Sequence, residues 1–117
     1  DICKNSTLKM IREKIRKINK NSICILFGSQ IKKPSKDADI DLLFIIPSEY
    51  DLEKFEKLTK NQLVAYPCDI NICTEEEMLK MWSTPEKLNV GNEILNNHIV
   101  LYGAEHFLNL IKRYYVG

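Results

Sequence analysis

No stretch of this sequence is apolar for the roughly 20 residues that a membrane-spanning helix needs. The N-terminus also lacks the charged, apolar and small-residue regions of a signal peptide. No internal repeat, low-complexity segment or linker interrupts the chain. Hydrophobic residues make up 44% and charged residues 28%, the composition of an ordinary globular protein and not that of a disordered segment. We therefore expect a folded, cytoplasmic protein.

The length of 117 residues is close to the commonest size of a single domain. Two independent domains would each be too small, so we expect one domain over residues 1–117. The sequence begins at Asp1 without a methionine. Whether further residues or another domain precede it is left open.

The four cysteines contain no CxxC pair, and two of them lie inside apolar, strand-like runs. We interpret them as buried free thiols, ahead of a zinc site or a disulfide framework. They are Cys3, Cys24, Cys68 and Cys73.

The net charge of +1 conceals an uneven distribution of charge along the chain. Residues 1–36 carry ten basic and two acidic residues, a balance of +8. Residues 37–117 carry seven basic and fourteen acidic residues, a balance of −7. Such a dipole can steer an anion or a charged partner. An amphipathic helix whose solvent face happens to be lysine-rich explains the basic segment equally well.

Hydrophobic periodicity predicts a mixed succession of helices and strands. Ser48 with Asp51 and Thr74 with Glu77 are spaced as capping boxes that open two of the helices. The predicted fold class is α/β (α+β), a small mixed sheet with helices packed on it. Strands are expected at 22–27, 39–46, 65–73 and 99–102, and helices at 7–20, 51–63, 75–82, 85–97 and 104–115.

Two aspartates share one face of the strand expected at 39–46. Side chains at i and i+2 project from the same face about 7 Å apart at Cα, so Asp39 and Asp41 should point together. Desolvation and mutual repulsion oppose the ionisation of such a pair, and a bound Mg²⁺ relieves both. On the spacing alone, a solvated strand entrance beside a loop is the stronger interpretation.

Asp69 favours the metal site. It lies in another strand-like run, in which Ile70 and Ile72 face away from it. If the two strands are neighbours, three carboxylates converge on one patch, which suits two divalent metals roughly 4 Å apart. By itself, Asp69 would more often be an ordinary polar strand residue.

Gly28 and Ser29 end the strand expected at 22–27. A glycine there allows close backbone approach, while the following amides and the Ser29 hydroxyl can donate hydrogen bonds to phosphate oxygens. A lone Gly-Ser pair is usually a turn. Its position eleven residues before Asp39 makes the combination specific.

Together these residues resemble a known signature. Phe27-Gly28-Ser29, followed by Asp39-Ile40-Asp41-Leu42 and later by Asp69, is similar to the pattern of polymerase-beta-like nucleotidyltransferases. Gly91-Asn-Glu93-Ile-Leu and Ile99-Val-Leu-Tyr102-Gly103 resemble the C-terminal part of the minimal nucleotidyltransferases, or MNT proteins. The resemblance covers roughly residues 22–107.

The resemblance implies a nucleotidyltransferase fold, two Mg²⁺ ions and ATP as the donor. Asp39 and Asp41 would ligate both metals, and Asp69 would bind the catalytic metal and help to activate the acceptor hydroxyl. Gly28 and Ser29 would hold the β- and γ-phosphates. The hydroxyl would attack the α-phosphorus in line and release pyrophosphate.

The sequence departs from the family pattern at two places. Gln30-Ile-Lys-Lys33 stands where a second glycine is usual, and Ala38 stands where serine is usual. Lys32 and Lys33 are interpreted as surface lysines, slightly ahead of a role as compensating phosphate ligands.

The two histidines and four of the aromatic residues are expected to have structural roles. His98 and His106 have no partner at metal-ligand spacing and are expected at the surface or at helix ends. Packing in the core or an interface is preferred to stacking on a base for Trp82, Tyr102, Tyr114 and Tyr115.

Three functions are weighed. The first is transfer of AMP from ATP to a tyrosine of a partner HEPN-type toxin, an antitoxin role, as the resemblance implies. The second is an antitoxin or binding module that masks its partner without catalysis. The third is transfer to a small molecule, such as an aminoglycoside, or to an RNA end. RNA ranks last because no aromatic-interleaved basic surface accompanies the basic segment. Self-association is left open.

Overall fold

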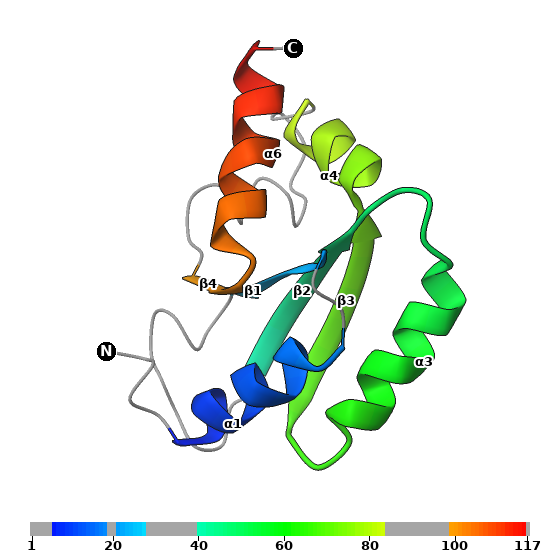
Figure 1. Ribbon diagram of the computed structural model, residues 1–117, viewed down its shortest axis with the longest axis vertical. Coiled ribbons are helices and arrows are strands. Elements are labelled where there is room, and N and C mark those ends of the chain that lie inside the picture. Colours follow the sequence, from blue (N-terminus) through cyan, green and yellow to red (C-terminus); the bar gives the residue numbers. More distant parts are fainter. Residues whose placement is uncertain (1–5, 19–20, 28–39, 84–98, 117) are drawn as a thin grey trace.

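The structure, a computed structural model, describes residues 6–18, 21–27, 40–83 and 99–116 (Figure 1). The described residues form four helices and four strands, which confirms the predicted mixed α/β (α+β) class. The helix expected at 85–97 lies outside them. In chain order the elements are α1 (Ser6–Arg16), β1 (Ile23–Phe27), β2 (Ile40–Ile46), α3 (Leu52–Gln62), β3 (Cys68–Thr74), α4 (Glu75–Trp82), β4 (Ile99–Tyr102) and α6 (Ala104–Val116).

The four strands form one mixed sheet in the order β3-β2-β1-β4. β2 pairs in parallel with β3 and antiparallel with β1, and β1 pairs antiparallel with β4. All five residues of β1 are buried. Central strands covered on both faces need apolar side chains at successive positions, which explains the continuous apolar runs of β1 and β2. Pro67 directly precedes the edge strand β3, as its missing N–H requires.

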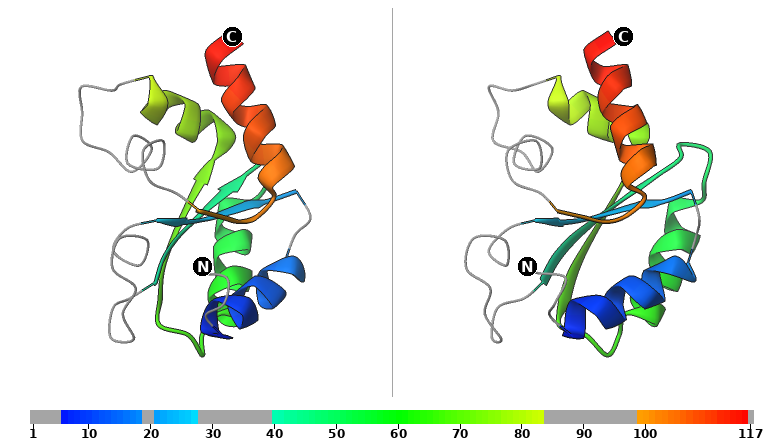
Figure 2. Two further views of the ribbon diagram at one scale, coloured as in Figure 1. Left: turned by 90° about the vertical axis from the view of Figure 1, so that its left-hand side faces the viewer. Right: turned by 60° about the vertical axis from the view of Figure 1, so that its left-hand side comes forward.

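Helices cover both faces of the sheet, with α1 and α3 on one face and α4 and α6 on the other (Figure 2). Two hydrophobic clusters result, because alternate residues of each strand point to opposite faces. The first cluster lies under α1 and α3 and contains Leu8, Ile11, Ile15, Cys24, Leu26, Ile40, Leu42, Phe44, Ile46, Phe55, Leu63 and Leu101. The second lies under α4 and α6 and contains Ile23, Ile25, Phe27, Leu43, Ile45, Cys73, Met78, Trp82, Phe107 and Leu110.

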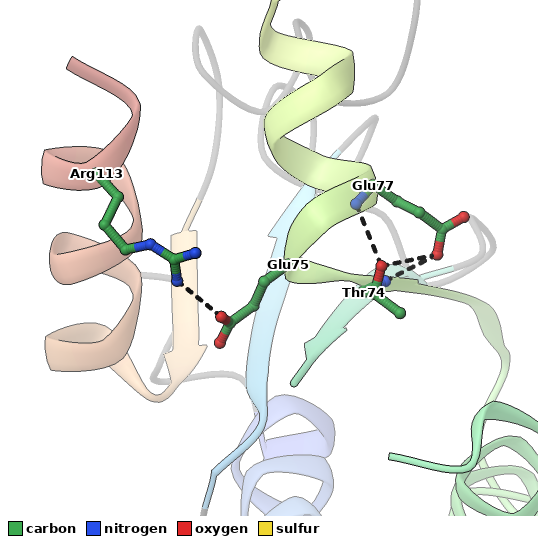
Figure 3. Close-up of polar contacts among 4 residues, drawn as sticks. All are labelled: Thr74, Glu75, Glu77 and Arg113. Carbon is green, nitrogen blue, oxygen red and sulfur yellow. Dashed lines mark hydrogen bonds and ion pairs between the residues drawn. The ribbon is translucent and has the colours of Figure 1, made fainter. Parts of the chain in front are cut away.

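The capping box expected at Thr74 is present (Figure 3). The Glu77 N–H donates to the Thr74 hydroxyl at 3.2 Å, and the Thr74 N–H donates to the Glu77 carboxylate at 3.0 Å. The Arg113 guanidinium lies 2.9 Å from the Glu75 carboxylate, and the same view shows the two side chains pointing toward each other. This ion pair joins α6 to α4 over the second cluster.

The capping box expected at Ser48 and Asp51 is wrong. The N-cap of α3 is Asp51 itself, whose carboxylate accepts a hydrogen bond from the Lys54 N–H at 3.2 Å. A backbone hydrogen bond from the Tyr50 N–H to the Pro47 carbonyl closes a turn before the helix. Ser48 lies in that turn, before the helix begins, so its hydroxyl does not cap α3.

Helix α1 ends at Arg16, before the predicted boundary at residue 20. The Lys17 and Ile18 N–H groups donate to carbonyls three residues earlier, those of Lys14 and Ile15. Such tightened bonds are typical of a final helical turn. None of the described helices has the length and apolar character needed to cross a membrane.

Gly103 is expected to tolerate no side chain. Its φ is +81°, and a Cβ there would lie 2.7 Å from the Ser22 carbonyl oxygen. Gly103→Ala should therefore lower the free energy of unfolding by about 2 kcal/mol or more, because the left-handed backbone and the contact are both unfavourable. Urea denaturation would measure this.

Gly103→Asn separates the two causes. Asparagine accepts positive φ more readily than alanine but carries the same Cβ. We expect Gly103→Asn to be destabilised by the contact but less than Gly103→Ala, and the difference between the two variants measures the cost of the left-handed backbone. Wild-type stability of Gly103→Asn would show that the close contact with Ser22 relaxes without cost.

Candidate active site

Two of the three predicted carboxylates lie on neighbouring strands. β2 and β3 run parallel, and Asp41 and Asp69 are partners in their register. Paired strands lie about 4.8 Å apart, so the two aspartates occupy adjacent positions across the sheet. The sequence argument required these strands to be neighbours, and they are.

Both aspartates belong to the face of the sheet that α4 and α6 cover. On β2, Asp41 shares a face with Leu43 and Ile45. On β3, Asp69 shares a face with Cys73, four residues later. Leu43, Ile45 and Cys73 all belong to the second cluster. The residues on the other face are Ile40, Leu42, Phe44 and Ile46 of β2 with Ile70 and Ile72 of β3. This division of the two strands agrees with the sequence prediction.

The pair lies at one end of the sheet. Phe27, the last residue of β1, is the register partner of Asp41, which is in turn the partner of Asp69. A single row across three strands therefore contains Phe27, Asp41 and Asp69. Along the chain, Gly28 and Ser29 directly follow Phe27, and Asp39 lies two residues before Asp41. Gly28, Ser29 and Asp39 lie outside the described residues.

Solvent reaches this end of the sheet. Asp69 is exposed and Asp41 is half-buried, whereas the five residues that follow Asp41 in β2 are all buried. The two carboxylates are therefore at least partly open to solvent, while the strands that carry them are held by the core.

Asn71 follows Asp69 on the same face of β3, and sequence reasoning did not single it out. Its side-chain amide donates a hydrogen bond to the Leu42 carbonyl at 3.4 Å, from a half-buried position. This contact ties β3 to β2 beside the two aspartates. The i+2 spacing from Asp69 was the signal available in the sequence.

The arrangement of the aspartates favours a bound cation. Like charges at directly opposed positions of neighbouring strands are destabilising, and a nearby positive charge relieves that repulsion. Carboxylate oxygens are the ligands that Mg²⁺ prefers, so these side chains fit the expected metal. The described residues contain no group of three His, Cys, Asp or Glu side chains arranged to hold a metal. The third predicted ligand, Asp39, lies outside them.

Trp82 is a core residue and does not stack on a base. Its side chain is fully buried, with ring centroids 6.1 Å from Phe107 and 5.5 Å from Tyr114. The Tyr114 hydroxyl also donates to the Trp82 carbonyl at 2.9 Å. Tyr102 packs half-buried against the first cluster, and His106 is exposed on α6. His98 and the Tyr115 side chain are not described.

The cysteines that the structure describes are free thiols. Cys24 and Cys73 are buried and Cys68 is half-buried. Burial raises the pKa of Cys73 to about 12, so this thiol is neutral at physiological pH. Burial likewise raises the pKa of Cys24 well above its usual value. The prediction of buried free thiols is confirmed for these two residues, while Cys3 lies outside the described part.

No family model and no curated protein matches this chain. A solved structure, described as a crystal structure of a toxin-antitoxin with AMP-PNP, contains a chain of similar fold. The fold occurs in a toxin-antitoxin structure. The TM-score is 0.59 at 16% sequence identity, and the match covers 90% of this chain and 82% of that one. At this identity the likeness shows the fold alone.

Proposed function

We propose that this chain is a Mg²⁺-dependent nucleotidyltransferase that transfers AMP from ATP to a hydroxyl group. One observation carries the proposal: Asp41 and Asp69 are register partners at the end of the sheet where β1 stops, directly before Gly28 and Ser29. The resemblance of these residues to the MNT signature supports it. The neighbour with the similar fold adds support, because its description names AMP-PNP, an analogue of ATP.

Each residue has a role in the proposed reaction. Asp39, Asp41 and Asp69 would hold two Mg²⁺ ions, and the Gly28-Ser29 amides and hydroxyl would bind the phosphates. When bound, Mg²⁺ neutralises phosphate charge and favours ionisation of the acceptor hydroxyl. That hydroxyl oxygen would form the new bond to the α-phosphorus, while the bond from the α-phosphorus to the oxygen that bridges it to the β-phosphorus would break and release pyrophosphate. The acceptor proton passes to the Asp69 carboxylate, which solvent already reaches.

We further propose that the acceptor is a tyrosine of a partner HEPN-type toxin, which gives the chain an antitoxin role in the cytoplasm. Asp69 is exposed at the end of a four-stranded sheet, where a hydroxyl carried by another molecule can reach it. The fold neighbour's description as a toxin-antitoxin favours a protein over a small molecule or RNA.

A second candidate is an antitoxin that masks its partner without catalysis. The segment Gln30–Lys33 and Ala38 favour it, because they replace the glycine and serine of the family pattern near the expected phosphate site. Both candidates include a stable complex with a protein. They differ in whether that protein gains AMP.

Purification of the chain from its native host, followed by intact-mass analysis, tests the proposal. With ATP and Mg²⁺ present, a co-purifying small helical protein should gain the mass of one AMP, and EDTA should prevent the gain. A stable complex that never gains AMP would support the second candidate. Recovery of the chain alone, with label from ATP appearing on a small molecule or RNA, would overturn the toxin as acceptor.

ATP with Mg²⁺ should raise the melting temperature of this protein more than ATP with EDTA does. A ligand that binds only the folded state stabilises it by about 2.7 kcal/mol at a hundredfold excess over its dissociation constant. Asp69→Asn and Asp39→Ala should lose the Mg²⁺-dependent part of the shift. Glu49→Gln, which removes an exposed charge from the turn before α3, should keep it. A wild-type shift in Asp69→Asn would mean that the nucleotide binds elsewhere.

A further inference from the structure

Helix α1 has a buried face and a strongly basic solvent face. Leu8, Ile11 and Ile15 are buried in the first cluster. The Arg16 guanidinium is 3.3 Å from the carboxylate of Glu13, the one acidic residue of this helix. The other basic residues of α1 are Lys9, Arg12 and Lys14, and Lys17 follows directly after the helix. Lys14 is half-buried and the other three are exposed.

Only some of these cations stabilise the helix that carries them: Lys14 and Arg16 lie in its last turn, where positive charge is favoured. The first turn of α1 contains no acidic residue, although negative charge is favoured at a helix N-terminus. Arg12 and Arg16 are four residues apart, a spacing at which like charges repel along a helix. Negative charge from outside α1 would relieve both effects.

An apolar hollow lies within this basic face. Met10 is 55% exposed, and with Lys9, Glu13 and Lys14 it lines a hollow of about 240 Å³ that Tyr66 completes. Tyr66 belongs to the segment between α3 and β3, so two parts of the chain build the hollow. Its walls are the Met10 side chain, the stems of the charged residues and the tyrosine ring. A partner that covered this hollow would remove its apolar surface from water, which is energetically favourable.

We propose that this surface, consisting of Lys9, Met10, Arg12, Lys14, Lys17 and Tyr66, docks an acidic segment of a partner protein. One apolar side chain of that segment enters the hollow beside Met10. The inference rests on the proposed function in one respect, that the chain works with a protein partner.

Charge and apolarity together favour a protein as the occupant. The cations would attract a nucleic acid as well as an acidic protein. The apolar hollow, however, offers no hydrogen-bonding group to a nucleic acid backbone. Methionine, arginine and aromatic residues are enriched in the cores of protein interfaces. α1 packs on the face of the sheet opposite to Asp41 and Asp69, so a segment docked there leaves the carboxylates open (Figure 2).

Site-specific photocrosslinking from position 10 in the native host tests the occupant. The matched control carries the crosslinker at Leu108, which is 57% exposed on α6, across the sheet from α1. We expect position 10 to label one peptide of a partner protein, with net negative charge and an apolar residue at the attachment point. RNA at position 10, equal labelling of the same protein from position 108, or no adduct at position 10 would each overturn the inference.

Binding measurements with that partner, purified, separate the two contributions. Met10→Gln should weaken the affinity about tenfold, mainly through faster dissociation, because buried apolar contacts set complex lifetime. The double variant Lys9→Glu with Arg12→Glu should slow association and reduce its salt dependence. Leu108→Gln should bind as the wild type does. Wild-type binding by Met10→Gln and by the double variant would refute the docking surface.

Failure of the docking surface and failure of the proposed enzyme have different signatures. Asp41→Asn should still bind the partner through α1 while losing transfer. If the wild-type complex forms through α1 and never gains AMP, the proposed chemistry fails and the docking surface stands. If AMP transfer occurs but the α1 variants bind normally, the docking surface fails and the chemistry stands.

Discussion

Asp41→Asn is expected to abolish Mg²⁺-dependent AMP transfer while the protein without metal keeps or gains stability. Asp41 lies between Phe27 and Asp69 in the row across three strands, which makes it the central described residue of the site. An amide in its place is a neutral and weaker metal ligand, so the two-metal arrangement is lost. The same change removes the charge repulsion between Asp41 and Asp69 when no cation is bound.

The two effects require two measurements on one preparation. Radiolabelled AMP transfer to the partner protein gives the activity, and urea denaturation in EDTA gives the free energy of unfolding. Glu49→Gln serves as the matched control, because it removes one carboxylate charge from an exposed turn. Full activity of purified Asp41→Asn would refute the assignment of the site. Loss of activity together with loss of stability would instead indicate a structural role for Asp41.

The sequence was informative about the site because strands have a simple period. An i, i+2 spacing predicts which side chains share a face without any knowledge of the fold, and the faces of β2 and β3 agree with it. The pairing of Asp41 with Asp69 could not be derived in that way. They are 28 positions apart in the sequence, and their adjacency depends on which strands are neighbours and in what register. Only tertiary packing determines both.

The helix ends that were predicted wrongly depend on local hydrogen bonds. Ser48 and Asp51 match the capping-box spacing as well as Thr74 and Glu77 do, yet only the second pair forms one. The difference is the turn closed by Tyr50 and Pro47, which starts the helix three residues later. Residue types alone do not distinguish an N-cap from a residue in the turn before it, because serine and aspartate favour both places.

For Trp82, the prediction of packing in the core or an interface is confirmed. Trp82 could have stacked on a nucleobase or filled the core, since both environments favour a large flat ring. Trp82 is buried because α4 and α6 lie on the same face of the sheet (Figure 1). The helical spacing that places Trp82 four residues after Met78 is consistent with a core face, and both side chains are fully buried.

Trp82→Ala is expected to lower the free energy of unfolding by about 3–5 kcal/mol, which is a large fraction of the roughly 5–15 kcal/mol that holds a typical domain folded. The indole is fully buried and contacts the rings of Phe107 and Tyr114, so its removal leaves a cavity between α4 and α6. Urea denaturation followed by circular dichroism would measure the loss.

Tyr114→Phe is the matched control for Trp82→Ala, because it keeps the ring and removes only the hydrogen bond from the Tyr114 hydroxyl to the Trp82 carbonyl. A single hydrogen bond of this kind contributes about 1 kcal/mol.

The indole packs at α4 and α6, whereas the carboxylates lie at the N-terminal ends of β2 and β3. Folded Trp82→Ala should therefore retain the Mg²⁺-dependent rise in melting temperature. Equal losses of stability in Trp82→Ala and Tyr114→Phe would mean that α4 and α6 close around the cavity. Loss of the Mg²⁺-dependent rise in Trp82→Ala alone would place the indole in the nucleotide site.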